Sequence, residues 1–295
     1  MKEKRTRRRK LVYGHRIKQA LLGLVLLLLL FTLYSFYQSN YTFRTVEYTA
    51  ESPNLPNSFN DYKIAQISDL HNSIYEEKLL EKVEEADPDI VVITGDSFSK
   101  DDESTEDVIR FIEELSEQYQ TYLILGNHEL WTSDEKREEF IEAIEKTDAV
   151  FLENKAVPII RQGKKIYVYG LLEDEGYYGA EQYGENIPVT HYLGPKPKDY
   201  TVLLAHNPYY WEDYLQWGAD LTLSGHIHGG GIRLPGLGGV FSPAGYLFPE
   251  RDRGIFREGD KTLVISAGLG NSGTPFRLFN PPELVIITLK SLSIY

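Results

Sequence analysis

Five short motifs carry side chains that could bind metal ions. Together they supply Asp69, His71, Asp96, Asn127, His206, His226 and His228. The set offers oxygen and nitrogen donors but no thiolate, because the chain has no cysteine. Such donors suit Mn, Fe, Zn, Co or Ni better than Cu(I), and they are too rich in nitrogen for a typical Ca or Mg site. The sequence therefore predicts a site for divalent transition metals.

The spacing of these residues indicates how they would share two ions. Asp69 and His71 are two positions apart, and in an extended chain such residues face the same way, so both are expected to reach one ion. His226 and His228 repeat the spacing. Asp96 follows a glycine, and its two carboxylate oxygens allow it to bridge two cations. Ions about 3.5–4 Å apart would activate a bridging hydroxide for in-line attack on phosphorus.

A further histidine lies beside one of the predicted ligands. His128 follows Asn127, in a position to protonate the leaving oxygen of a phosphate ester. We therefore expect Asp96, Asn127 and His128 to take part in catalysis. His15 and His191 lie outside the motifs, and no role is assigned to them.

The motifs follow short apolar runs rich in Val and Ile, which are typical of buried strands. We expect strands at residues 62–67, 90–94, 121–125, 166–169, 201–205, 221–223, 262–266 and 284–289. Amphipathic helices are expected at residues 76–85, 106–119 and 133–146, with Ser133 capping the last. Alternating strands and helices predict an α/β layered domain, in which ligands bind beyond the carboxyl ends of the strands.

The N-terminal part of the chain has the composition of a membrane anchor. Residues 1–18 hold nine Lys or Arg and one acid, and residues 20–37 are uncharged and rich in leucine. The positive-inside rule keeps the basic segment in the cytoplasm and the domain outside. The alternative is a cleaved signal peptide, but we find no small-x-small cleavage site after the apolar run. The predicted parts are a cytoplasmic segment (1–18), a transmembrane anchor (19–38), a linker (39–60) and a catalytic domain (61–295).

The charge of the chain argues against nucleic acid as a partner. The net charge is −13, and outside residues 1–18 it falls to −21, which phosphate backbones would repel. The chain also has no Gly-x-Ser-x-Gly and no Walker motif, which excludes the common serine-hydrolase and P-loop signatures. The Gly- and Pro-rich residues 232–256 are either an apolar substrate pocket or a packed surface loop.

The series Asp-x-His, Gly-Asp, Gly-Asn-His-Glu, His and Gly-His-x-His over residues 62–230 resembles the calcineurin-like metallophosphoesterase superfamily. The resemblance implies a four-layer αββα sandwich. It implies one metal on Asp69, His71, Asp96 and His228, a second on Asp96, Asn127, His206 and His226, and His128 as the acid that contacts phosphate.

Residues 268–283 extend the likeness to a bacterial, membrane-attached branch that resembles UDP-2,3-diacylglucosamine hydrolases. One departure is the run from Gly95 to Ser99, where relatives often carry a second acid; it puts a supporting hydrogen bond in doubt. The expected function is therefore hydrolysis of a phosphomonoester, phosphodiester or pyrophosphate, with a lipid-linked or nucleotide-linked phosphate as a candidate substrate. The alternative is a membrane-anchored scaffold that binds metal without catalysis.

Overall fold

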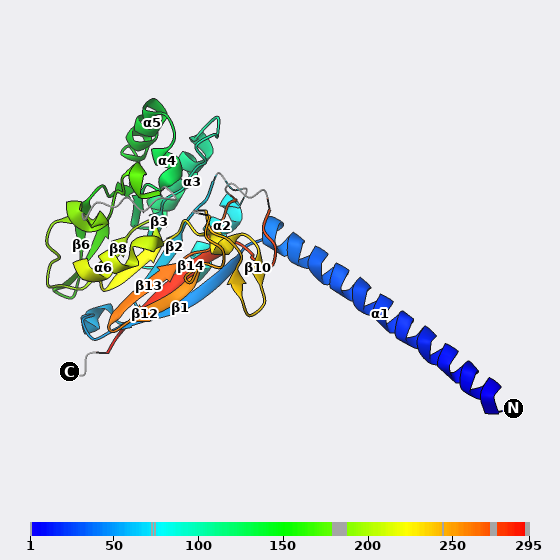
Figure 1. The fold of residues 1–295 in the computed structure, drawn as a ribbon. Helices are drawn as coiled ribbons and strands as arrows, with labels where there is room; N and C mark the ends of the chain where they lie inside the picture. Colours follow the sequence, from blue (N-terminus) through cyan, green and yellow to red (C-terminus); the bar gives the residue numbers. More distant parts are fainter. Residues whose placement is uncertain are drawn as a thin grey trace.

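A long helix projects from an α/β body in the computed structural model (Figure 1). The structure describes residues 2–71, 73, 75–178, 188–243, 245–271 and 276–292. Helix α1 spans Lys2–Tyr41, and its segment His15–Tyr41 is long and apolar enough to cross a membrane. The side chains from Leu21 to Leu30 are largely exposed, so the described protein leaves this apolar surface uncovered.

The first sheet carries the N-terminal half of the site. Its strand order is β1-β14-β2-β3-β4-β5, with β1 at Arg44–Ser52, β14 at Glu283–Ser291, β2 at Lys63–Ile67, β3 at Ile90–Thr94, β4 at Thr121–Ile124 and β5 at Val150–Phe151. The strands from β2 to β5 are parallel, and β14 is antiparallel to β2. The carboxyl ends of β2, β3 and β4 therefore lie along one edge.

The second sheet carries the other half. Its order is β12-β13-β9-β8-β7-β6, with β12 at Gly254–Glu258, β13 at Lys261–Ile265, β9 at Leu221–Ser224, β8 at Thr201–Leu204, β7 at Lys164–Gly170 and β6 at Lys155–Arg161. The four central strands are parallel, and both edge strands are antiparallel to their neighbours. A small hairpin, β10 (Arg233–Leu234) and β11 (Gly238–Gly239), follows β9.

Three apolar cores separate four layers. One core joins the inner faces of the two sheets, a second lies under α2 (Glu76–Ala86), α3 (Glu106–Gln118) and α5 (Asp134–Ile144), and a third lies under α6 (Trp211–Trp217). This is the predicted αββα sandwich. The shorter helical turns are α4 (Asn127–Leu130), η1 (Asn57–Phe59), η2 (Glu175–Tyr178), η3 (Val189–Leu193), η4 (Pro208–Tyr210) and η5 (His228–Gly230).

The predicted helices form where the sequence places them, for local reasons. The side chain of Ser133 accepts a hydrogen bond from the backbone N–H of Lys136, as expected of an N-cap. Helix α6 ends at Gly218, whose φ of 99° lies in the left-handed region that glycine adopts most easily. Helix α3 buries Val108, Phe111 and Leu115 on one face, which follows the helical period.

The prediction of a linker at residues 39–60 is wrong for most of that segment. Helix α1 continues to Tyr41, and nine residues from Arg44 to Ser52 then pair in parallel with β14 as strand β1. The polar composition of this segment suits β1, because β1 is the edge strand of its sheet and most of its side chains are exposed or only partly buried. Pro53 and Pro56, which cannot donate a backbone hydrogen bond, come after the strand has ended.

Candidate metal centre

All seven predicted ligands lie at the carboxyl ends of parallel strands. Five strands from the two sheets deliver them: β2 (Asp69, His71), β3 (Asp96), β4 (Asn127), β8 (His206) and β9 (His226, His228). Six of the seven side chains belong to two groups whose potential ligand atoms lie within 4.8 Å of one another. The first group is Asp69, His71, Asp96 and His228, and the second is Asp96, His206 and His226. Asp96 is common to both.

The amide of Asn127 joins the second group. Its Oδ1 lies 3.2 Å from Nε2 of His206, and that nitrogen lies 3.3 Å from Oδ2 of Asp96. The division between the two groups is the one that the family resemblance implies. The spacing of His226 and His228 suggested that both reach one ion, but in the structure their rings belong to different groups.

The backbone at the ligands is not extended. Five ligands have a positive φ: Asp69 (50°), His71 (46°), Asp96 (52°), His226 (69°) and His228 (51°). The prediction that an extended chain turns Asp69 and His71 toward one ion is therefore wrong about the backbone, although the two side chains do belong to one group. Asp and His tolerate this region better than most residues, but each still costs about 1–2 kcal/mol. The fold holds this strain where the ligands converge.

In the first group, two imidazole rings point at one place. Nε2 of His71 lies 3.3 Å from Nε2 of His228 and 3.7 Å from Oδ2 of Asp96. Each ring is held from behind: Nδ1 of His71 lies 3.1 Å from Ser99 Oγ, and Nδ1 of His228 lies 3.1 Å from the guanidinium of Arg277. Ser99, at the end of the run that departs from the family pattern, thus supports His71 with a hydrogen bond.

In the second group, a backbone carbonyl sets the tautomer of His206. The Nδ1–H of this ring donates to the carbonyl oxygen of Thr94 over 2.7 Å, which directs Nε2 toward Asp96. Burial lowers the pKa of His206, but the charges of Asp96 and Asp69 outweigh this and raise it to about 10. Without a metal, a proton on Nε2 offsets the negative charge of these carboxylates, and a bound cation would take over that role.

The electrostatics of the buried acids also favour cations. Burial raises the pKa of Asp69 to about 6, and the nearby Asp96 adds to the rise. Burial lowers the pKa of His71 to about 3 and that of His226 to about 3, so these two rings are neutral and can act as ligands. Two divalent ions would supply the positive charge that these buried carboxylates need. The residues present thus fit a two-metal centre.

Glu129, to which the sequence assigned no role, holds the turn that carries Asp96. Its buried carboxylate accepts hydrogen bonds from the backbone N–H groups of Gly126 (2.8 Å), Asp96 (3.0 Å) and Ser97. The glutamate lies within the Gly-Asn-His-Glu motif, so its position signalled importance but not its role. It joins the turn after β3 to the turn after β4, and thereby sets the distance between Asp96 and Asn127.

His128 lies at the edge of the two groups. Its backbone N–H donates to Oδ1 of Asp96 over 2.8 Å, and its ring Nδ1 accepts the backbone N–H of Lys100 over 3.1 Å. In the neutral ring the proton is therefore on Nε2. Burial lowers the pKa of His128. The other two histidines, His15 in α1 and His191 in η3, are exposed and belong to neither group.

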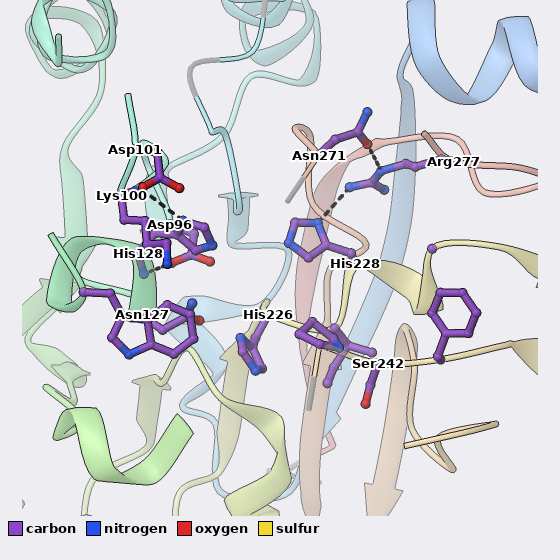
Figure 2. A pocket seen from close by; sticks show the side chains of 15 residues that line it. Asp96, Lys100, Asp101, Asn127, His128, His226, His228, Ser242, Asn271 and Arg277 are labelled. Carbon is purple, nitrogen blue, oxygen red and sulfur yellow. Dashed lines mark hydrogen bonds between the residues drawn. The ribbon is translucent and has the colours of Figure 1, made fainter. Parts of the chain in front are cut away.

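A cavity of about 440 Å³ opens beside the ligands. Figure 2 shows Asp96, His128, His226 and His228 around it, with Arg277 reaching His228 and Asn271. Phe241 and Ser242 form part of its wall. A second cavity, of about 460 Å³, shares His226 and is lined by six aromatic residues together with Glu250 and Arg251. The aromatic residues are Tyr177, Tyr178, Tyr209, Tyr210, Tyr246 and Phe248.

Comparisons with known proteins agree with this arrangement. The profile of the calcineurin-like phosphoesterases matches residues 62–230. An uncharacterised metallophosphoesterase of Aquifex aeolicus is 30% identical over 85% of this chain and 93% of its own length. A transmembrane protein with a metallophosphoesterase domain from Bos taurus is 28% identical over 82% of this chain and 56% of its own. The UDP-2,3-diacylglucosamine pyrophosphatase LpxG of Chlamydia muridarum is 26% identical over 76% and 82%.

Members of this family normally bind two divalent metals, and this chain has two groups of candidate ligands that share Asp96. The motifs, the fold and the sequence match agree over the same residues. The chain belongs to the calcineurin-like phosphoesterase family.

Proposed function

We propose that the protein hydrolyses a phosphate ester or pyrophosphate with two divalent metal ions bound by Asp69, His71, Asp96, Asn127, His206, His226 and His228. The observation that carries the proposal is the pair of ligand groups sharing Asp96 at the wall of a cavity that His128 also lines. When bound, Mn, Fe, Zn, Co or Ni ions would supply a water of lowered pKa and neutralise charge on the phosphoryl oxygens.

The side chains of the cavity have separate tasks in this proposal. His128 protonates the leaving oxygen from its imidazolium form, which gives up the Nε2 proton and is left as neutral imidazole. In the neutral ring Nδ1 accepts the N–H of Lys100, and the backbone N–H of His128 is fixed to Asp96. Asn127, Asp96 and His206 would hold the second metal together with His226. Arg277 orients His228 from behind and forms part of the cavity wall.

The substrate we propose is an amphiphilic phosphate ester. Helix α1 fits a membrane anchor, and relatives include transmembrane proteins. The positive-inside rule favours a cytoplasmic N-terminus and an extracytoplasmic domain. LpxG is named for a nucleotide-linked lipid, which supports a lipid-linked or nucleotide-linked substrate here.

The test compares the full chain, in detergent micelles with Mn²⁺, on aryl phosphate monoesters, aryl phosphodiesters and nucleotide pyrophosphates. Turnover of at least one class is expected. In the variant Asp96→Asn, metal and activity should be lost together, because this carboxylate belongs to both ligand groups. If all three classes remain uncleaved while two metals are bound, the scaffold alternative replaces the proposal.

A second variant tests the acid. His128→Gln should retain both metals and lower kcat by roughly 10²–10⁴-fold, the usual contribution of a general acid. The matched control is His191→Gln, an exposed histidine that lies outside the ligand groups. Full activity of His128→Gln would overturn the assignment of the acid.

A further inference from the structure

The end of helix α1 is fixed to the catalytic domain by hydrogen bonds. Phe279 N–H donates to Ser35 Oγ over 2.9 Å, and Asn280 N–H donates to Ser39 Oγ over 3.1 Å. The side-chain amide of Asn40 bonds both backbone groups of Arg277, its Nδ2 donating to the carbonyl (2.8 Å) and its Oδ1 accepting from the N–H (2.9 Å). The anchor and the domain therefore form one body at this contact, instead of being joined by a tether.

The contact reaches well into the apolar part of α1. The rings of Phe31 and Phe279 stack with centroids 5.4 Å apart, and Phe36 lies 6.0 Å from Phe276. Phe31 precedes Tyr37, the end of the apolar run, by six residues, which is about 9 Å along a helix axis. Residues 20–37 are barely long enough to cross a hydrocarbon layer of roughly 30 Å. With the run in the bilayer, residues 276–280 lie at or below the membrane surface.

A group of exposed apolar side chains continues from this contact. We call it the apolar rim: Leu234, Leu237, Phe241, Tyr246, Leu247, Phe248 and Phe276. The hairpin β10–β11 that carries part of it lies beside the end of α1 in Figure 1. It is tied to the docked segment by a bridge between Ile232 and Leu278 and by a hydrogen bond from Arg233 N–H to the Leu278 carbonyl, over 2.9 Å.

The rim has little charge to keep it in water. Residues 232–248 contain a single charged side chain, Arg233, and it pairs with Asp252 at 2.8 Å. Large exposed apolar groups that lie together mark a contact with another apolar surface. Because the neighbouring α1 is itself suited to lipid, the surface that would cover the rim is the same bilayer.

The rim also forms walls of both cavities. Phe241 lines the cavity of the metal centre, and Tyr246, Leu247 and Phe248 line the second cavity, which shares His226 with the metal centre. The two cavities thus bring apolar side chains of the rim together with polar side chains of the ligand groups. This matches a lipid whose phosphate is near the surface of the bilayer.

We propose that the apolar rim enters the leaflet on which the domain sits, and that the metal centre takes a lipid phosphate ester directly from it. The identity of the substrate rests on the proposed phosphoesterase function, whereas the membrane contact of the rim does not. The partner is thus a lipid surface, held in register by the docking of α1.

The contact is tested on the full chain in phosphatidylcholine nanodiscs. The chain has no cysteine, so Leu237→Cys and Ile160→Cys each accept a single nitroxide label. The two positions are 67% and 70% exposed, and Ile160 is in β6, an edge strand of the second six-stranded sheet. The label at 237 should be accessible to oxygen and shielded from a water-soluble paramagnetic chelate, and the label at 160 should show the reverse. Equal accessibility to the chelate would overturn the membrane contact.

The substrate class is tested with two diesters that share one scissile bond, methyl and hexadecyl 4-nitrophenyl phosphate. In nanodiscs kcat/KM for the hexadecyl ester should exceed that for the methyl ester at least tenfold. Leu237→Glu should remove this advantage without changing methyl ester turnover, and Ile160→Glu should leave both rates unchanged. Equal rates on the two esters would overturn the lipid class. If neither ester is cleaved, the result counts against the phosphodiesterase chemistry. The spin-label experiment then still decides whether the rim contacts the membrane.

Discussion

The variant Glu129→Gln should weaken metal binding and leave the stability of the fold nearly unchanged. The carboxylate accepts three backbone N–H groups, two on Oε2 and one on Oε1. Glutamine keeps its oxygen toward Asp96 and Gly126 and turns its NH₂ against the N–H of Ser97. The loss is one charge-assisted hydrogen bond, about 1.5–3 kcal/mol.

The substitution also removes an unfavourable charge. Burial, with a contribution from Asp96, raises the pKa of Glu129 to about 7. A rise from the usual 4.5 corresponds to a charging cost on the order of 3 kcal/mol in the folded state, most of which applies at pH 7. Because this pKa is raised, the glutamate favours folding below about pH 4.5 and loses that contribution as the pH rises through about 7. At pH 7 the two effects nearly offset, so the metal-free variant should melt within a few degrees of the native protein.

Metal affinity should respond differently. The turn at Asp96 and Ser97 loses part of its anchor, and loss of a group that orients a ligand typically costs 10–100-fold in metal affinity. We expect Mn²⁺ affinity, measured from the EPR signal of free Mn²⁺ with the full chain in micelles, to fall by about that factor. Glu138→Gln, an exposed acid on α5, is the matched control and should change neither property. Unchanged Mn²⁺ affinity, or a loss of stability above about 5 kcal/mol, would refute the reasoning.

Three other perturbations have outcomes that follow from the structure. In Gly225→Ala the new Cβ would collide with Ser68 Oγ and Asp69 Oδ2, so metal binding should be lost in a Mn²⁺ titration. The control is Gly163→Ala, where the new Cβ meets open space at φ 73°. It should lower stability by only about 1–2 kcal/mol and leave metal binding unchanged. Chelation should remove activity reversibly, and because ligand at 1,000 times Kd contributes about 4 kcal/mol, it should lower Tm by on the order of 10 °C; an unchanged Tm would mean that metals do not stabilise the fold. A chain that starts at residue 53 loses β1 and exposes the edge of β14. In size-exclusion chromatography with detergent, which covers the apolar rim, this chain should aggregate, whereas a chain that starts at residue 43 should stay monodisperse; equal behaviour would show that β1 is dispensable.

The sequence predicted the parts of the fold whose signals are local. The runs before Asp69, Asp96 and His206 are apolar and short, so they identify buried strands without knowledge of their neighbours. The order of motifs along the chain then indicated the candidate ligands, because each motif follows on a strand. The pairing partner of β1 is about 240 residues away in sequence, at β14, and no local pattern announces it.

The sequence by itself therefore determined which residues can bind metals and at which ends of which strands they lie, since donor chemistry and apolar periodicity belong to the residues themselves. Only the tertiary structure decided how the donors divide into two groups, because His226 and His228 both have left-handed backbone and their rings join different groups. It also decided that Glu129 and Arg277 support those donors, and that α1 docks on residues 276–280. These contacts join segments far apart in the chain, and their geometry exists only after both sheets have packed.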